Sequence, residues 1–327
     1  VVSRIFTDAD PVFIGPVMSV GNLYIGPLYY YFMLPFLWLS YPSPMGPVYA
    51  VAIMGTLLIP LMYVLGSQMI GKRAAIFATF LLAISSSAVE LSRFSWNPNL
   101  MPFFGFLWFY CLYRSARGER WYWVGVSLCL AVLIQLHYIT FLAVAVSGLV
   151  WLWRVVVEKR QGKLGALVVP SVLAVSIVIL FQLPLFLFDT RHDWLNARQF
   201  AKLLQGKDAF ANDSAGLERL TEIIFQSRDR FAQFMVDITF ALGSQTANLL
   251  AYLAVVLSVV FWSKDKRSTV QTAVQLLLLT LLVSLIGLSI YKNDVYLHYL
   301  GFLLPLVFLL YGYVLDQLIK LYRPLAV

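Results

Sequence analysis

The sequence predicts an all-α polytopic membrane protein with about nine transmembrane helices and additional helices at the exterior interface. Composition is the first observation: 61% of the 327 residues are hydrophobic and only 12% are charged, whereas soluble domains carry about 25% charged residues. The second is a series of apolar segments near the 20 residues that a hydrocarbon core of about 30 Å requires. The third is that basic residues gather between these segments, as they do in membrane proteins.

Apolar stretches that meet the length requirement give the predicted spans. They are 47–70, 73–90, 99–114, 121–137, 138–157, 165–188, 247–263, 269–291 and 296–319. A further apolar stretch, 24–41, is short, contains Pro27 and Pro35 and is rich in tyrosine. We therefore expect it to form an interfacial helix on the membrane surface rather than a span.

The basic clusters set the orientation, because they follow alternate turns between the spans. They are Lys72 and Arg73; Arg114, Arg117 and Arg120; Arg154, Lys159, Arg160 and Lys163; Lys264, Lys266 and Arg267; and Lys320 and Arg323. The positive-inside rule places such clusters on the cytoplasmic face of the plasma membrane. The other ends of the spans, and the loops that join them, are then exterior.

This orientation divides the chain into four parts. An exterior loop with an interfacial helix covers 1–46, and an N-terminal transmembrane bundle covers 47–188. An exterior loop with amphipathic helical patterning covers 189–246, and a C-terminal bundle covers 247–327. The net charge of +8 is accounted for by the basic clusters between spans, so it does not indicate nucleic-acid binding.

Ionisable residues outside the basic clusters and the 189–246 loop are few, and those near the span ends fall on the exterior face. They are Arg4, Asp8, Asp10, Glu90, Arg93, His137, Lys292, Asp294 and His298. Each also has a purely structural interpretation, such as an Asp-Pro turn for Asp8 and Asp10 or an interface anchor for Trp96. Since charge is expensive in a membrane, their gathering on one face indicates a functional site there.

Three sequence blocks resemble the polytopic C-type glycosyltransferases, in the branch that includes protein O-mannosyltransferases and the lipid A aminoarabinose transferase. They are YIGPLYYYFMLPFLWL (24–39), SRFSWNPNLMPFF (92–104) and LAVLIQLHYITFL (130–142). The resemblance implies transfer of a sugar from a polyprenyl-phosphate donor to a glycan, lipid or protein acceptor on the outer face. It also implies that a first span precedes the opening loop, so the chain looks truncated and the principal catalytic acid is expected at Asp10, Asp8 or upstream of Val1.

Such a transfer needs a carboxylate that takes a proton from the acceptor and cations that hold the departing phosphate. We expect Arg93, His137, His298 and Lys292 to converge on one exterior pocket as the phosphate ligands. Candidate substrate-binding residues are Tyr29, Tyr30, Trp96, Asn97, Asn99, Gln135 and Tyr138. Asn97 and Asn99 stand where many relatives place an acid, which leaves the use of a divalent metal open, and no other cofactor is predicted.

A polytopic transporter or flippase is the main alternative function. Its substrate site would lie near the membrane midplane, between repeated halves. Spans 47–70, 73–90, 165–188 and 269–291 carry no ionisable residue at mid-depth, and the sequence shows no internal repeat. These observations favour the transferase.

Overall fold

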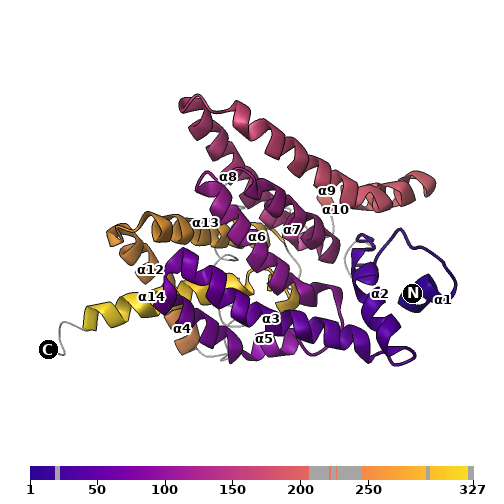
Figure 1. The fold of residues 1–327 in the computed structure, drawn as a ribbon, viewed down its shortest axis with the longest axis horizontal. Helices are drawn as coiled ribbons and strands as arrows, with labels where there is room; N and C mark the ends of the chain where they lie inside the picture. Colours follow the sequence, from indigo (N-terminus) through magenta and orange to yellow (C-terminus); the bar gives the residue numbers. More distant parts are fainter. Residues whose placement is uncertain (19–22, 206–220, 222–225, 227–244, 292–294, 323–327) are drawn as a thin grey trace.

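The computed structural model describes residues 1–18, 23–205, 221, 226, 245–291 and 295–322 (Figure 1). Its regular elements in these ranges are helices, together with one isolated bridge between Val17 and Tyr24. The prediction of an all-α fold is therefore confirmed.

Helices occupy every predicted span. Those in the N-terminal bundle are α3 (Met45–Ile70), α4 (Lys72–Ala83), α5 (Ser86–Leu91), α6 (Met101–Ala116), α7 (Tyr122–Leu136), α8 (Phe141–Arg160) and α9 (Gly165–Arg191). Those in the C-terminal bundle are α12 (Gln245–Lys264), α13 (Ser268–Ile290) and α14 (Leu304–Tyr322). Within the described residues, five segments are long and apolar enough to span a membrane: α3, Tyr138–Arg160, α9, α13 and α14. The count of nine spans stays a prediction.

The predicted span 73–90 is not one helix, which corrects the sequence interpretation. It breaks between α4 and α5, where the Ser85 hydroxyl accepts a hydrogen bond from the backbone N–H of Ala88 at 3.2 Å. Serine at this position caps a new helix because its side chain satisfies an amide of the first turn. The hydrophobic pattern continues across the break, which is why it predicted a single span.

Helix α14 packs mainly against α4 and also contacts α6, and it is the most buried of the candidate spans. Glycines allow this close packing. A Cβ atom on Gly312 would lie 2.4 Å from the Ala74 carbonyl oxygen of α4, and one on Gly105 would lie 2.5 Å from the Phe302 carbonyl oxygen. Small residues bring helices together in this way inside membranes, and large rings such as Trp108 and Phe308 fill the remaining core.

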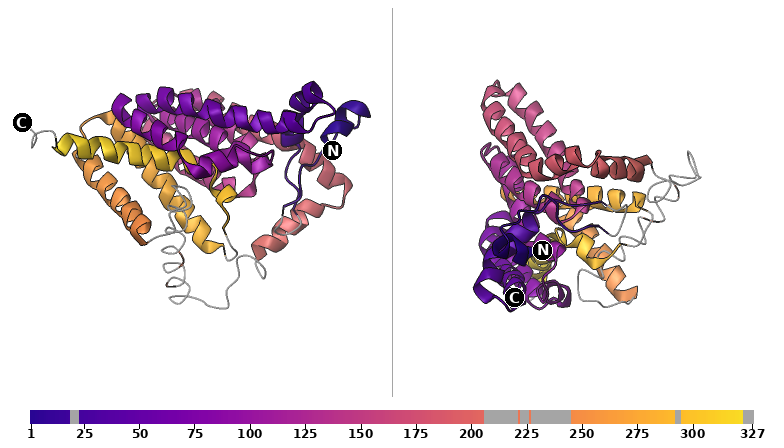
Figure 2. Two further views of the ribbon diagram at one scale, coloured as in Figure 1. Left: turned by 90° about the horizontal axis from the view of Figure 1, so that it is seen from below. Right: turned by 90° about the vertical axis from the view of Figure 1, so that its right-hand side faces the viewer.

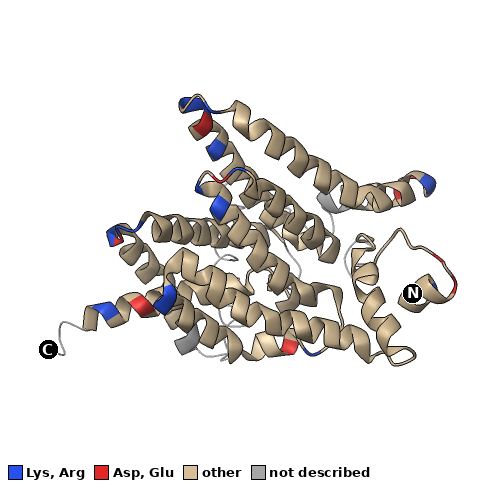
Figure 3. Cartoon of the chain, viewed as in Figure 1, with Lys and Arg blue, Asp and Glu red and all other residues tan. Residues whose placement is uncertain are grey.

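The basic clusters share one side of the molecule, which we call the basic face. In Figure 3 the blue segments at the start of α4, at the α6–α7, α8–α9 and α12–α13 turns and at the end of α14 all lie to the left. Each acid of this face has an ion-pair partner. Glu119 pairs with Arg114, and Asp265 pairs with Arg267. Glu158 pairs with both Arg120 and Arg154, and Asp316 with both Arg73 and Lys320. The clusters thus lie on one shared side, as their alternation along the sequence predicted.

The opposite end carries short surface helices: α1 (Val2–Thr7), α2 (Leu28–Ser40) and α10 (Leu195–Gln205). Figures 1 and 2 show α1, α2 and the α9–α10 connection at the end of the molecule farthest from the C-terminal end of α14. Helix α2 corresponds to the predicted interfacial helix and includes Pro35. The rest of the predicted amphipathic loop lies largely outside the described residues.

Candidate active site

Three short turns of 3-10 helix lead into three long helices at the end opposite the basic face. They are η1 (Asn97–Leu100) before α6, η2 (Tyr138–Thr140) before α8 and η3 (Leu297–Leu300) before α14. Trp96 and His137 stand directly before the first two turns, and His298 lies in the third. The ring of His298 lies 4.3 Å from that of Trp96 and 5.9 Å from that of His137, measured between centroids. Tyr299 closes the group, with its ring 4.6 Å from that of His137.

Hydrogen bonds hold His137 and its surroundings in place. The Asn97 side-chain amide donates to the Leu136 carbonyl oxygen at 2.6 Å and so ties η1 to the end of α7. The backbone N–H of Ile139 donates to Nδ1 of His137 at 3.2 Å. Since Nδ1 is the acceptor in this geometry, the neutral ring carries its proton on Nε2 and has one N–H free to donate.

The two histidines, which lie in connections between helices, are neutral at physiological pH. Burial, with a smaller effect of His298, lowers the pKa of His137 to about 3. Burial lowers the pKa of His298 to about 4. A buried imidazole loses the hydration that stabilises its charged form. In this neutral state the two rings act as hydrogen-bonding groups, and their binding of the donor phosphate stays a prediction.

Arg93 lies in a different part of the same end. It is exposed and lines a cavity of about 190 Å³ together with Ser92 and Asn99 from the α5–α6 connection and with apolar residues of α3 and α4. Asn99 donates to the Phe94 carbonyl oxygen at 2.9 Å, while its own side-chain oxygen is buried and has no partner among the described residues. Trp96 and Asn99 thus connect, through one turn, the histidine cluster and the arginine cavity.

Three of the predicted substrate-binding residues lie at helix α2. Gln135 and Tyr29 fix helix α2 in place: Gln135 accepts from the Leu28 N–H at 3.1 Å, and the Tyr29 hydroxyl lies 2.6 Å from that of Ser95. Tyr30 neighbours Tyr29 with ring centroids 6.2 Å apart.

Tyr138 belongs to a second groove, of about 330 Å³, between α7, α9 and α10. Its hydroxyl accepts from Asn196 at 3.1 Å and donates to the Tyr24 carbonyl oxygen. The buried Asp189 carboxylate accepts the N–H groups of Asn196 and Ala197 at 2.6 and 2.8 Å, which anchors α10. The sequence interpretation missed Asp189 and Asn196, because both stand in a polar stretch that looks solvated.

Asp8 and Asp10 lie just after α1, away from these contacts. Asp10 forms an ion pair with Arg4, and the Asp10 and Arg4 side chains are 40% and 62% exposed, respectively. Lys292 lies outside the described residues. Within the described ranges, no group of three or more His, Cys, Asp or Glu side chains is arranged to hold a metal ion.

The chain is similar to one protein family in sequence and to solved membrane-protein structures in fold. Residues 46–193 match the family described as dolichyl-phosphate-mannose-protein mannosyltransferase. The structure is similar to that of ArnT from Cupriavidus metallidurans bound to undecaprenyl phosphate, with a TM-score of 0.64, and to the same protein in the apo state, with a TM-score of 0.60. Both are 15% identical to this chain and cover 97% of it, while the chain spans about half of their length, 54% and 53% respectively. No curated protein sequence matches.

The fold and these comparisons define an integral membrane protein with the architecture of the C-type glycosyltransferases. The resemblance inferred from the three sequence blocks is confirmed. The 46–193 match includes the SRFSWNPNLMPFF and LAVLIQLHYITFL blocks, which carry Arg93, Trp96 and His137.

Proposed function

We propose that the protein is a membrane glycosyltransferase that moves a sugar from a polyprenyl-phosphate donor to an acceptor on the outer face of the plasma membrane. The observation that carries the proposal is the meeting of Trp96, His137 and His298 from three separate connections, opposite the basic face. The binding of undecaprenyl phosphate by the similar ArnT structure supports a donor of this class.

Arg93 is the proposed ligand of the departing lipid phosphate. Negative charge grows on that phosphate as the sugar leaves, so a fixed cation stabilises the transition state more than the ground state. An arginine stays charged and donates to two oxygens at once. The 190 Å³ cavity gives Arg93 apolar walls on α3 and α4 and a polar end at Ser92 and Asn99, which suits a phosphate attached to a hydrocarbon chain.

The histidines have a different role in this proposal. As neutral rings they position groups by hydrogen bonding, with the Nε2–H of His137 as a donor. Trp96, packed on His298, provides an aromatic face of the kind on which a sugar ring stacks. The two histidines and Trp96 are thus assigned to the sugar and its ring oxygens rather than to the phosphate.

A carboxylate must take the proton of the acceptor hydroxyl as it attacks the anomeric carbon. Of the predicted candidates, Asp10 is held by Arg4, while Asp8 has no ion-pair partner among the described residues. Both stay proposals for the catalytic base, with Asp8 the freer carboxylate of the two.

The test is transfer of radiolabelled sugar from a panel of polyprenyl-phosphate donors in membranes that contain the protein. The proposal expects label in a product that no longer contains the donor lipid, and a loss of that product in the Arg93→Ala variant. Movement of the intact donor lipid across the membrane without transfer would instead support the flippase. If no donor supports either sugar transfer or movement of the donor lipid, both the transferase and the flippase are contradicted.

A further inference from the structure

A groove on the other half of the molecule has no part in the proposed transfer. It lies between α7, α8 and α9, has a volume of about 370 Å³, and is lined by residues that include Val126, Gly148, Trp151 and Val175. Helix α9 is the least buried of the candidate spans, with only 11% of its apolar window covered by protein. The groove therefore lies along a helix that faces lipid.

The serine hydroxyls of the groove wall and the Trp151 indole are hydrogen-bonded to the protein, whereas the buried indole N–H of Trp123 has no partner among the described residues. Ser171 accepts from the Trp151 indole N–H and Ser147 from that of Trp108, both at 2.9 Å, and Ser127 donates to the Val124 carbonyl oxygen at 2.9 Å. The body of a ligand in this groove must consequently be apolar, since a buried polar group would find few partners. A hydrocarbon chain meets that requirement.

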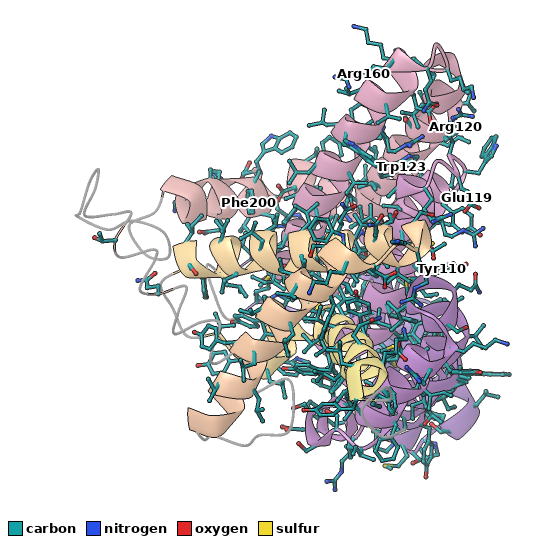
Figure 4. The ribbon with its side chains drawn as sticks, turned by 90° about the vertical axis from the view of Figure 1, so that its left-hand side faces the viewer. Tyr110, Glu119, Arg120, Trp123, Arg160 and Phe200 are labelled. Atoms are coloured by element: carbon teal, nitrogen blue, oxygen red, sulfur yellow. The ribbon has the colours of Figure 1, made fainter. Side chains whose placement is uncertain are left out.

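One end of the groove is strongly basic. Trp123 of α7 and Trp151 of α8 line the groove. Arg154 stands three residues after Trp151 on α8, and Arg120 lies in the turn before α7, where its carbonyl oxygen accepts from the Trp123 N–H at 3.2 Å. Arg120 and Arg154 both pair with Glu158, so the two arginines mark the same end of the groove. Figure 4 shows Arg120 near Trp123, and Arg160 at the far end of the α8–α9 hairpin.

The two arginines share a single carboxylate. Glu158, with 1% of its side chain exposed, accepts from Arg120 at 2.6 Å and from Arg154. The cluster keeps a net positive charge in a partly buried place, where an anion is attracted more strongly than in water. Lys159 and Arg160 add to the same field, while Trp121 and Trp153 are exposed at this level as interface anchors.

We infer that this groove binds an anionic glycerophospholipid, with an acyl chain between α7, α8 and α9 and the headgroup phosphate at Arg120 and Arg154. Basic pockets between helices on the cytoplasmic side recognise anionic headgroups, and the basic face is the predicted cytoplasmic side. The ligand is distinct from the proposed sugar donor, whose phosphate belongs at the opposite end beside Arg93.

Gly148 allows the acyl site to be closed without disturbing the protein. It lines the groove, and a Cβ atom added to it meets nothing within 4 Å. Gly148→Leu therefore places a side chain in the space assigned to the lipid. Gly165→Leu is the matched control, because Gly165 is equally open and does not line the groove.

The headgroup site has its own pair of variants. Arg154→Gln removes one cation from the shared cluster, and Lys163→Gln removes one from the exposed α8–α9 turn of the same face. Native mass spectrometry of the purified protein, exchanged against phosphatidylglycerol, phosphatidylcholine and undecaprenyl phosphate, measures the lipid that each variant retains. Thermal unfolding of each variant checks that it is folded.

We expect the wild type to retain phosphatidylglycerol over phosphatidylcholine, and Gly148→Leu and Arg154→Gln each to weaken that retention about tenfold, the equivalent of roughly 1.4 kcal/mol. The Gly165→Leu and Lys163→Gln controls should bind as the wild type does. Equal retention of the two phospholipids, or unchanged binding in Gly148→Leu, would overturn the inference. Preferential loss of undecaprenyl phosphate from Gly148→Leu would also overturn it, since the groove would then hold the carrier lipid. If Arg154→Gln does not fold, Gly148→Leu decides the question.

Discussion

Replacement of Gln135 by methionine should release helix α2 from the bundle. The Gln135 side chain accepts from the Leu28 N–H at 3.1 Å and donates to the Phe181 carbonyl oxygen at 2.7 Å, so one residue of α7 joins α2 to α9. Leu28 is the first residue of α2, where backbone N–H groups have no partner within the helix. Gln135 therefore acts as a cap supplied by a neighbouring helix.

The expected cost follows from these two bonds. Leaving the Leu28 N–H without a partner costs about 1–3 kcal/mol, and loss of the bond to Phe181 costs about 0.5–1.5 kcal/mol. Methionine keeps the length of the side chain and its unbranched shape. This matters because the Gln135 amide lies directly against Gly26, where an added Cβ would be only 2.2 Å from Oε1. Because the Phe181 bond joins α7 to α9 and only the Leu28 bond holds α2, a loss of about 1–3 kcal/mol is expected for the docked state of α2.

A cysteine at Met33, which is 1% exposed, reports on the docking of α2 through its rate of reaction with a maleimide. With Cys111 and Cys129 replaced by alanine, Gln135→Met should raise this rate roughly 5- to 150-fold, since 1.4 kcal/mol is a factor of ten. Gln161→Met, at an exposed turn, is the control. A change of less than about threefold would refute the claim that Gln135 anchors α2.

Further predictions concern the site and the orientation. Arg93→Ala should lower sugar transfer by about 100-fold or more, as loss of a transition-state donor does, without a change in melting temperature; transfer near the wild-type rate would remove Arg93 from the site. Thermal stability should be highest above about pH 6.5 and fall toward pH 4, because the unfolded chain binds protons that His137 and His298, with their lowered pKa values, do not. A His298→Asn variant should show a weaker acid loss, and an unchanged profile would contradict the assignment. A membrane-impermeant maleimide added outside cells should label Tyr296→Cys and not Lys266→Cys, and the reverse pattern would invert the topology.

Features that depend on local pattern were predictable from the sequence. Apolar length predicted the helices from α3 to α14, and the alternation of Lys and Arg predicted that the basic clusters share one side. The same patterning failed between α4 and α5, because the capping hydroxyl of Ser85 interrupts the helix without interrupting the hydrophobic run. At this position the local hydrogen bond, rather than the hydrophobic composition, determines where the helix ends.

The site was predictable as a set of loops but not as an arrangement. Sequence placed Trp96, His137 and His298 at one end, yet their contact depends on how η1, η2 and η3 are packed by the long helices. Sequence alone gives no burial, so it could not show that the histidines are neutral. Nor could the sequence show that Arg93 lines a separate cavity, because tertiary packing determines the direction in which a side chain in a turn points.

Asp189 and Asn196 are residues that the sequence interpretation missed for the same reason. Both stand in a polar stretch, and their burial arises because α10 folds back on the end of α9, where Asp189 accepts two of its N–H groups. Asn196 in turn bonds to Tyr24 and Tyr138, which come from distant parts of the chain. Contacts of this range leave no periodic signal in a single sequence.

The most direct test of the proposed function is sugar transfer in sealed vesicles of known orientation. Radiolabelled polyprenyl-phosphate sugar and acceptor are supplied on one side only, with the wild type and Arg93→Ala compared in both orientations. We predict transfer only when the face that carries Trp96 and His137 meets the donor, with loss of that transfer in the variant. Transfer supported from the side of Lys266, or transfer unaffected by Arg93→Ala, would contradict the proposed site.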